Sequence, residues 1–298
     1  MRLDQYLVQT TKLSRHQVQK MIEQGLVRVD NRVVCKPARK IQGKESVQYT
    51  LPKSHDAFDL TPQAIPLNIL YEDAEIAVIN KPADLVIHPA AGNPSGTLVN
   101  ALLHRYGFLP PADDDETKPG IVHRLDKGTS GVMVVARTAE ALKNLQSQFK
   151  NRQTEKVYLT LVVGKIEQEG TIDKPLGRHP VARQKISTRS KSARPALTEW
   201  KVLKYFGDAF SWLEVRIHTG RTHQIRVHLA DAGHPVVGDP TYGRSARKYR
   251  TLIARPALHA LRLGLTHPKT GEKMVFEAPL PEDIQHVLSY AGTLVRSS

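Results

Sequence analysis

The chain has 298 residues, a length that predicts one large domain with a small one, or two domains of middling size. Hydrophobic residues make up 40% and charged residues 24%, which argues against wholesale disorder. The longest apolar runs, such as residues 132–136, are far shorter than the roughly 18–20 residues that a membrane span needs. A single cysteine, Cys35, excludes an intramolecular disulfide and any cysteine-rich zinc module. Because the first residues do not resemble a secretory signal, we expect a cytoplasmic protein that binds no membrane.

The charge balance is strongly basic. Lysines and arginines number 43 against 29 acidic residues, for a formal net charge of +14. The excess is concentrated near the N-terminus, where residues 1–55 hold 11 Lys/Arg and 4 Asp/Glu. Such a surplus attracts polyanions and favours binding to phosphate backbones. It predicts a basic N-terminal module on an enzyme that handles RNA or DNA, although charge alone leaves open a soluble basic protein without such a partner.

Residues 1–52 have the pattern of a small module of helices and strands. Apolar residues at helical spacing predict a first helix around residues 3–7 and a second after Ser14, which is placed to cap it. Alternating apolar residues at 26–34, around an Asp-Asn turn, predict a β-hairpin. A further strand is predicted at residues 46–51.

The segment SRHQVQKMIEQGLVRVDNRVV within this module resembles the S4 RNA-binding domain, and the resemblance covers roughly residues 1–52. It implies that the module binds RNA through basic residues on its exposed side. For each of these residues a solvated surface without a ligand is the alternative. The candidate phosphate contacts are Arg15, His16, Lys20, Arg28 and Arg32.

The rest of the chain predicts a linker and a larger domain. Residues 53–66 have linker composition, because the stretch 52–66 holds three prolines among polar residues and has no clear periodicity. Residues 67–285 predict an α+β domain with a mixed, largely antiparallel sheet flanked by helices, because strands are joined by both hairpin-length and helical connections. A C-terminal tail is expected at residues 286–298. Strands are predicted at 69–71, 75–80, 132–136, 157–163 and 212–217. Helices are predicted at 98–106 and after Thr138, which is placed to cap the second of them.

Two loops of the larger domain have a biased composition. Residues 113–116 are four consecutive acids, which we interpret as a solvated loop tip, with a divalent-ion site as the alternative. Residues 174–194 hold seven Lys/Arg and no acid. This stretch is too polar to pack, so it predicts a mobile basic loop that orders on RNA.

The most informative segment is GIVHRLDKGTSGVMVVA at residues 120–136, where a polar loop with three glycines leads into an apolar strand. Its order His-Arg-Leu-Asp differs from the His-Arg-Asp-Leu of a protein-kinase catalytic loop. The KGTS order reverses that of a P-loop. A zinc base deaminase needs His-x-Glu with Cys-x-x-Cys, which one cysteine cannot supply. These three classes of site are excluded.

The block GIVHRLDKGTSG closely resembles the catalytic motif of the RluA-type pseudouridine synthases. Two further segments match in the same order: KVYLT at 156–160, and HTGRTHQIRVHL at 218–229 continuing into HPVVGDPTYG at 234–243. The resemblance covers roughly residues 64–285, and nearly the whole chain with the S4 part. It implies an enzyme without metal or cofactor that isomerises uridine in RNA to pseudouridine. The S4-like N-terminus is most similar to members that act on large-subunit ribosomal RNA.

This reaction needs an anionic group beside the sugar and base. The family motif designates Asp126 as the nucleophile or base, and attack at C1′, attack at C6 and abstraction of a sugar proton all stay open. A nearby guanidinium would keep this carboxylate ionised, and by motif position that partner is Arg226, with Arg221 as the alternative. Tyr158 matches the family tyrosine that stacks on the target base and can move the C5 proton.

A uridine within a stem or loop must leave its stack to reach Asp126, so base flipping is implied. Arg124 resembles the family arginine that holds the vacated or flipped nucleotide, with a phosphate contact as the alternative. Leu258 and Leu263 match positions that wall the uracil pocket, with core packing as the alternative. The predicted substrate-binding residues are His123, Arg124, Arg221 and Leu258.

Three histidines, His218, His223 and His228, recur at five-residue steps. On a helix this step rotates each side chain by about 140° from the last, so the three cannot share one face as zinc ligands. We therefore expect no metal site.

Taken together, these patterns predict a monomeric, cofactor-free RNA pseudouridine synthase. Its expected partner is large-subunit ribosomal RNA, either as free RNA or as part of a pre-ribosomal particle. One alternative is the same chemistry on transfer RNA or small-subunit ribosomal RNA. Another is a non-catalytic RNA-binding factor for ribosome assembly.

Overall fold

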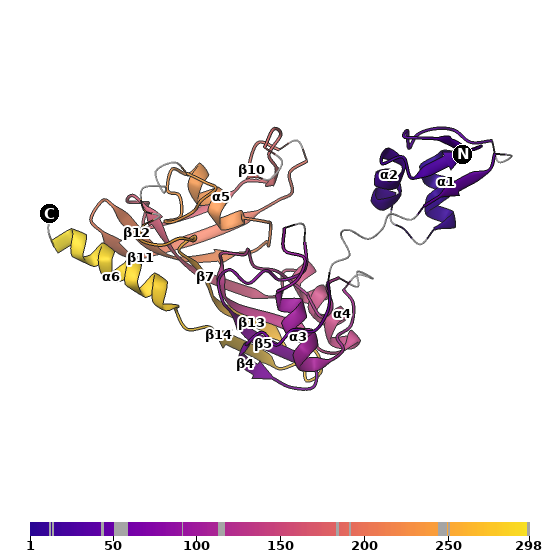
Figure 1. Ribbon diagram of the computed structural model, residues 1–298. Helices are drawn as coiled ribbons and strands as arrows, with labels where there is room; N and C mark the ends of the chain where they lie inside the picture. Colours follow the sequence, from indigo (N-terminus) through magenta and orange to yellow (C-terminus); the bar gives the residue numbers. More distant parts are fainter. Residues whose placement is uncertain are drawn as a thin grey trace. The chain divides into compact units, whose positions relative to one another are not determined.

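Figure 1 shows a computed structural model of the chain, which divides into two compact units, Met1–Ala57 and Phe58–Ser298. The described residues are 1–11, 13, 15–42, 45–50, 59–90, 92–112, 117–182, 185–190, 192–243, 249 and 251–296, with the side chains of 16, 17, 20 and 294–296 excepted. No helix within these ranges has the length and apolar character to cross a membrane.

The N-terminal unit contains two helices, α1 (Leu3–Thr10) and α2 (Arg15–Glu23), and a three-stranded antiparallel sheet. Its strands are β1 (Val27–Val29), β2 (Arg32–Val33) and β3 (Val47–Tyr49), in the order β2-β1-β3. One apolar cluster joins helices and sheet, from Leu3 of α1 through Met21 of α2 to Val29 of β1. Asp30 and Asn31 both have positive φ, as a tight two-residue hairpin turn requires. The predicted helices, hairpin and third strand are confirmed, while Ser14 lies outside the described residues.

The second unit is organised around a nine-stranded mixed sheet. The parallel pairing of β6 with β13 is the exception among antiparallel pairs within the described residues. This arrangement confirms the predicted α+β class with a mixed, largely antiparallel sheet. The strand order is β4 (Asn68–Glu72), β5 (Ile76–Lys81), β6 (Ser130–Ala136), β13 (Leu258–Thr266), β7 (Glu155–Val163), β12 (Phe210–Ile217), β11 (Leu197–Phe206) and β8 (Glu169–Asp173), with β14 (Lys273–Glu277) paired to β13.

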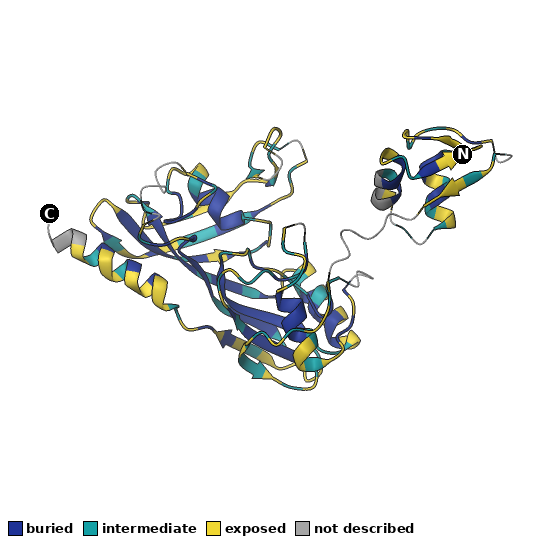
Figure 2. Ribbon diagram, in the orientation of Figure 1, coloured by how far each residue is buried: buried dark blue, intermediate teal, exposed yellow. Residues whose placement is uncertain are grey.

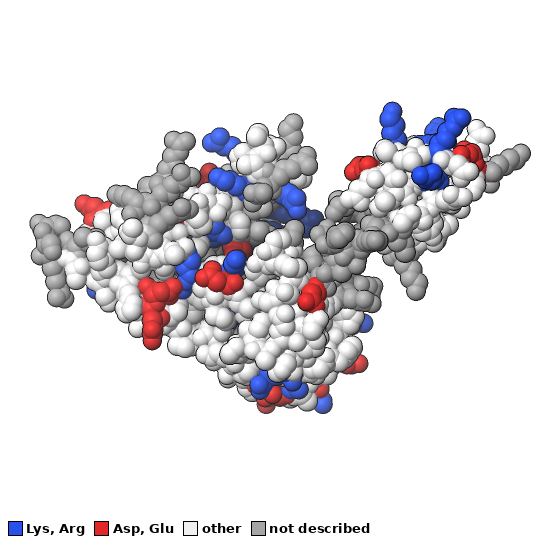
Figure 3. Space-filling model, in the orientation of Figure 1, with Lys and Arg blue, Asp and Glu red and all other residues white. Residues whose placement is uncertain are grey.

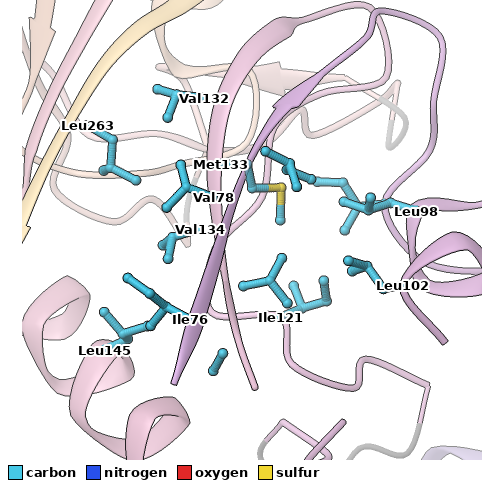
Figure 4. Close-up of a cluster of buried hydrophobic side chains, with 14 of the residues drawn as sticks. Ile76, Val78, Leu98, Leu102, Ile121, Val132, Met133, Val134, Leu145 and Leu263 are labelled. Atoms are coloured by element: carbon cyan, nitrogen blue, oxygen red, sulfur yellow. The ribbon is translucent and has the colours of Figure 1, made fainter. Parts of the chain in front are cut away.

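The helices α3 (Leu98–Tyr106) and α4 (Ala139–Lys150) cover opposite faces of the β5–β6 part of this sheet. Figure 4 shows Leu145 of α4 on one side with Val134, and Leu98 of α3 on the other side with Met133. Because both faces are covered, every residue of β6 is buried. The predicted capping by Thr138 is confirmed, since its side chain accepts a hydrogen bond from the Ala141 N–H at the start of α4.

Two further helices flank the other half of the sheet, α5 (Gln224–Asp231) and α6 (Glu282–Arg296). The expected C-terminal tail at 286–298 is therefore wrong for residues 286–296. Ile284, Val287 and Ala291 are buried against β11 and β12 at helical spacing, while the outward side of α6 is exposed (Figure 2). An apolar stripe makes this segment a packed helix.

Two other segments with a biased composition differ from the sequence expectation, and a third is not described. Residues 59–63 of the predicted linker bond to the second unit, because Asn100 of α3 donates from Nδ2 to the carbonyls of Asp59 and Thr61. The predicted mobile loop at 174–194 contains a short antiparallel pair, β9 (Gly177–Arg178) and β10 (Ile186–Ser187), and Leu176 is buried. The acidic residues 113–116 lie outside the described residues.

Candidate active site

Asp126 lies in the polar loop that precedes β6. Two buried cations, Lys81 and Arg255, donate hydrogen bonds to backbone carbonyls of this loop. Lys81 at the end of β5 donates from Nζ to the carbonyls of Pro82, Leu85 and Lys127 at 2.7, 3.0 and 3.4 Å. Burial lowers the pKa of Lys81 to about 8. The Thr129 N–H donates to the Asp126 carbonyl at 3.0 Å and closes the turn that presents the carboxylate.

Arg255 holds the other side of the same loop. Its Nη1 donates to the Gly128 carbonyl at 3.1 Å, while Nε and Nη2 form a bidentate pair with Asp283 at 2.6 and 2.7 Å. Gly131 is required at the start of β6, because it has φ +119° and a Cβ there would lie 2.1 Å from the Ala260 carbonyl oxygen. The close approach of β6 and β13 therefore sets where Asp126 stands.

The partner of Asp126 is Arg226 on α5. Nη1 of Arg226 lies 3.1 Å from Oδ2 of Asp126, and its Nε and Nη2 lie 2.6 and 2.9 Å from the two oxygens of Asp239. Burial alone would lower the pKa of Arg226, but the hydrogen bonds and charge of Asp239 outweigh it and raise the pKa. A permanent cation thus faces the Asp126 carboxylate. Arg221, the sequence alternative, instead donates from Nε to the Pro195 carbonyl at 3.3 Å.

A histidine and a tyrosine extend this network. Nε2 of His223 lies 3.8 Å from Oδ2 of Asp126, and its Nδ1 lies 2.8 Å from the Tyr242 hydroxyl. The hydroxyl also accepts the Ile186 N–H of β10 at 2.9 Å, so its own proton is free for Nδ1. This assigns the remaining N–H of His223 to Nε2, facing Asp126. Burial lowers the pKa of His223, which keeps the ring neutral near pH 7.

The backbone places His223 at a special position. It is the residue before α5 and has φ +55°, a left-handed conformation that costs a non-glycine residue about 1–2 kcal/mol. The helix α5 begins directly after it, at Gln224. Such strain is typical of functional sites.

Six of the residues singled out by sequence line one pocket with about 490 Å³ of empty space. Tyr158 enters it from β7, and burial raises the pKa of its phenol, so the hydroxyl is protonated across the physiological range. Leu263 is buried in the core between the sheet and α4 and does not line this pocket, which favours the core-packing alternative for that residue. The six are Arg124, Asp126, Tyr158, Arg221, Arg226 and Leu258.

His123 is the predicted substrate residue that lies elsewhere. Its Nε2 accepts the Val134 N–H at 3.1 Å, and its ring stacks on Phe149 with centroids 4.5 Å apart. Burial lowers the pKa of His123 to about 3. The ring is therefore neutral and fixes the loop onto β6 and α4, while it lines a groove next to the pocket.

The RNA-binding candidates of the N-terminal unit are partly described. Arg28 on β1 and Arg32 on β2 are exposed, opposite the buried face of the hairpin. Arg15 is exposed and lies 3.6 Å from the buried Asp4. The side chains of His16 and Lys20 lie outside the described residues. Figure 3 shows lysine and arginine side chains gathered along one edge of this unit.

The histidines of the second unit do not form a metal site. Across the described ranges no group of three or more His, Cys, Asp or Glu side chains is placed to hold a metal ion. His218 and His223 precede α5, and only His228 lies on it, so the assumption that all three share a helix is wrong. His228 bonds to Thr198 Oγ1 and the Lys174 carbonyl, both at 2.9 Å.

Sequence reasoning missed Lys81, Arg255, Asp239, His223 and Tyr242 as members of the site. Asp239 and Tyr242 were inside the matching segment HPVVGDPTYG, and His223 was inside HTGRTHQIRVHL. Their position in those segments was a signal that these residues belong to the site. It did not indicate which side chains they contact. Lys81 and Arg255 had no sequence signal, since a lysine at a strand end and an arginine in a loop are ordinary surface residues.

Known proteins are similar to this chain along its whole length. Residues 75–231 match the family model described as RNA pseudouridylate synthase, and residues 1–47 match that of the S4 domain. A Nitrosomonas europaea protein named ribosomal large subunit pseudouridine synthase D is 43% identical, over 100% of this chain and 86% of its own length. The Escherichia coli K12 protein of the same name is 41% identical, over 96% and 89%.

Two further relatives carry less specific names. An Aquifex aeolicus protein named uncharacterized RNA pseudouridine synthase is 46% identical, over 97% of this chain and 93% of its own. The solved structure of human RNA pseudouridylate synthase domain containing 1 superposes with a TM-score of 0.61. It is 29% identical and covers 79% of this chain and 97% of that one.

Proposed function

The chain belongs to the RNA pseudouridylate synthase family, as its resemblance to the RluA-type enzymes predicted, and we propose that it acts on large-subunit ribosomal RNA with Asp126 as its catalytic group. The family makes it a pseudouridine synthase with an S4 domain. Support for the ribosomal substrate comes from relatives named for the large subunit, which match this chain over both of its units. A small basic RNA-binding unit suits a large structured RNA.

The observation that carries the proposal is the ion pair between Asp126 and Arg226 inside the pocket. Conversion of uridine breaks the bond from C1′ to N1, turns the uracil and forms a bond from C1′ to C5, after which C5 loses its proton and N1 gains one. An ionised carboxylate at this point can add to C1′ or to C6, or can take a sugar proton. Arg226 favours the ionised form, and Asp239 holds Arg226 in place.

Tyr158 supports the second half of the reaction. Its ring lines the pocket beside Asp126 and offers a face for the uracil to stack on. Since its phenol stays protonated, it acts through hydrogen bonding, or it takes the C5 proton as it passes its own proton to another acceptor such as N1. Leu258 supplies an apolar wall on the same pocket.

A uridine that reaches this pocket has left its stack, so base flipping is part of the proposal. Arg124 is exposed at the pocket, two residues before Asp126, and has no acidic partner within ion-pair distance in the described part of the chain. Its free guanidinium suits the phosphate of the flipped nucleotide or the space that the nucleotide leaves.

Replacement of Asp126 by asparagine tests the function directly. Asp126→Asn should abolish pseudouridine formation in a large-subunit ribosomal RNA transcript, because asparagine cannot supply an anionic nucleophile or base. Its Kd for the transcript should stay within about threefold of the wild type, because Asp239 still holds Arg226. The exposed Asp208, which pairs with the exposed Lys165 at 3.6 Å, provides the matched control Asp208→Asn, which should retain full turnover.

Retained activity of Asp126→Asn would contradict the catalytic assignment. Absence of pseudouridine with the pure wild-type protein on bare transcript would favour an assembly factor over an enzyme acting on free RNA. Mapping of pseudouridines in a deletion strain distinguishes the substrates. Losses confined to transfer RNA or small-subunit ribosomal RNA would overturn the large-subunit proposal and leave the chemistry standing.

A further inference from the structure

A second hollow, which we call the basic groove, adjoins the pocket of Asp126. The two share Arg124, Tyr158 and Arg221 in their walls, so the groove is continuous with the place where the uracil must lie. No aspartate or glutamate is found among its described lining residues, although acids make up 29 of the 298 residues of the chain. Its five cationic side chains are Arg124, Lys150, Arg152, Lys156 and Arg221.

Lys156 is the most unusual of these cations because it is buried. Its Nζ donates to the Thr154 carbonyl at 3.3 Å and to the Thr154 hydroxyl at 2.9 Å, which are both neutral acceptors. It also lies 5.7 Å above the ring of Phe149. Within the described ranges no carboxylate lies within ion-pair distance of it, and burial and the charge of Arg152 lower its pKa. Removing an unpaired cation from water is costly, and an anion in the groove would offset that cost.

Two exposed cations at the C-terminal end of α4 line the same groove as Lys156. Lys150 is the last residue of α4, and Arg152 follows in the turn with φ +59°, a left-handed conformation that a non-glycine residue rarely adopts. The Arg152 N–H donates to the Phe149 carbonyl at 3.3 Å, which fixes this turn. Neither side chain has an acidic partner in the described part of the chain. The α4 dipole favours Lys150, and the left-handed Arg152 ends α4 as a Schellman motif, with the Gln153 N–H donating to the Gln148 carbonyl at 2.9 Å. What the two residues bring to the groove is therefore exposed positive charge that is unpaired within the described residues.

The spacing along β7 relates the groove to the reaction. Lys156 and Tyr158 are two residues apart on one strand, so their side chains point to the same side, about 7 Å apart. A uracil stacked on Tyr158 thus places the adjoining sugar and phosphate beside Lys156. The cations of the groove continue from that point toward the end of α4.

From these observations we propose that the basic groove binds the phosphodiester backbone of the nucleotides that flank the target uridine. The proposal rests on the proposed function, since it takes the Asp126 pocket to hold that uridine. Lys156 contacts the phosphate nearest the pocket, and Lys150 and Arg152 contact the next along the strand. The groove thereby holds the strand in place on one side of the flipped nucleotide and reads no base.

The test measures RNA binding in the Asp126→Asn protein, which removes turnover. One variant adds Lys156→Gln to this Asp126→Asn background. Because a buried substitution can disturb folding, a second variant instead adds the exposed pair Lys150→Gln with Arg152→Gln. Lys201→Gln on β11, an exposed lysine that does not line the groove, is the matched control. The ligand is a short single-stranded RNA with one uridine, measured by fluorescence anisotropy from 50 to 300 mM salt.

We expect Kd to rise about tenfold for each lost charged contact. The slope of log Kd against log salt should fall by about 0.7 per lost phosphate contact, while Lys201→Gln leaves both unchanged. RNAs with one neutral methylphosphonate beside the uridine sharpen the test. A methylphosphonate at the phosphate nearest the uridine should weaken binding to the Asp126→Asn protein but have no further effect once Lys156→Gln is added. A methylphosphonate at the next phosphate should likewise have no further effect in the variant that carries Lys150→Gln with Arg152→Gln.

Unchanged Kd and salt slope in the exposed double variant would overturn the proposal. The same holds if a methylphosphonate keeps its full effect in the variant that lacks the cation assigned to that phosphate, because the contacted phosphate would then lie elsewhere. Either result leaves the loss of turnover in Asp126→Asn intact, so the proposed function would stand. Absence of pseudouridine with the wild type would instead contradict the proposed function while the binding measurements remained interpretable.

Discussion

The guanidinium of Arg226 lies 3.1 Å from the carboxylate of Asp126, although the two residues are one hundred positions apart in the sequence. The same guanidinium is held by two shorter contacts to Asp239, whose side chain is fully buried. Asp239 therefore restricts where the Arg226 cation can be, and Asp126 receives only the remaining Nη1. The orientation of the Asp126 carboxylate, which we propose as the catalytic group, therefore depends on an acid that does not line the pocket.

This relationship predicts the effect of Asp239→Asn. Loss of the buried anion leaves Arg226 without its bidentate partner, so turnover should fall about 100-fold as the Asp126 pair loses its alignment. Breaking one side of a buried ion pair should also cost about 3–5 kcal/mol of unfolding free energy. Single-turnover rates and urea denaturation measure the two effects.

The exposed pair of Lys165 and Asp208 provides the control for that experiment. Asp208→Asn removes an acid whose side chain is 90% exposed, so both turnover and stability should be unchanged. Full turnover in Asp239→Asn would show that Arg226 is positioned without it and would refute the argument.

Tyr158→Phe separates the ring of Tyr158 from its hydroxyl. Phenylalanine keeps the face on which a uracil can stack, so the Kd for RNA should stay within about twofold of the wild type. Turnover should fall about 100- to 10,000-fold if the hydroxyl moves the C5 proton. Tyr158→Leu is the companion variant, which should lose binding as well as turnover. Equal turnover in the phenylalanine variant and the wild type would limit Tyr158 to stacking.

Much of the site was predictable because its residues occur in contiguous segments with recognisable order. Asp126, Tyr158 and Arg226 each stand in one of three separated segments, and the structure brings all three to one pocket. The partners of these residues were not predictable. The bond from Arg226 to Asp239 and the contact of Tyr242 with Ile186 depend on how α5, the following loop and β10 pack together.

The fold shows the same division between local and tertiary information. Strands such as β6 and β12 and the helix α4 were predicted from periodicity and capping, which are local properties. The segment 174–194 was predicted to stay unpacked from its charge, yet Leu176 is buried beside Tyr242 and Val227 of α5. A few apolar residues within a basic stretch were enough to anchor it, and only the tertiary structure supplies the surface that they bury against.

The neutral His123 predicts how stability depends on pH. Its pKa is about 3 in the folded chain against an ordinary value of 6.5, so between these values the unfolded chain binds the additional proton. The stabilising contribution is complete above pH 6.5 and is lost as the pH falls toward 3. Protonation would remove the lone pair that accepts the Val134 N–H, which is the physical reason for the penalty.

The variant His123→Gln keeps an acceptor for Val134 but cannot titrate. Between pH 7 and pH 5 the wild type should lose about 2 kcal/mol more unfolding free energy than His123→Gln. Urea denaturation at both pH values measures this difference. His286→Gln on α6 replaces an exposed histidine and should follow the wild type at both values. Parallel losses in the wild type and His123→Gln would mean that His123 is not the group whose protonation destabilises the fold in mild acid.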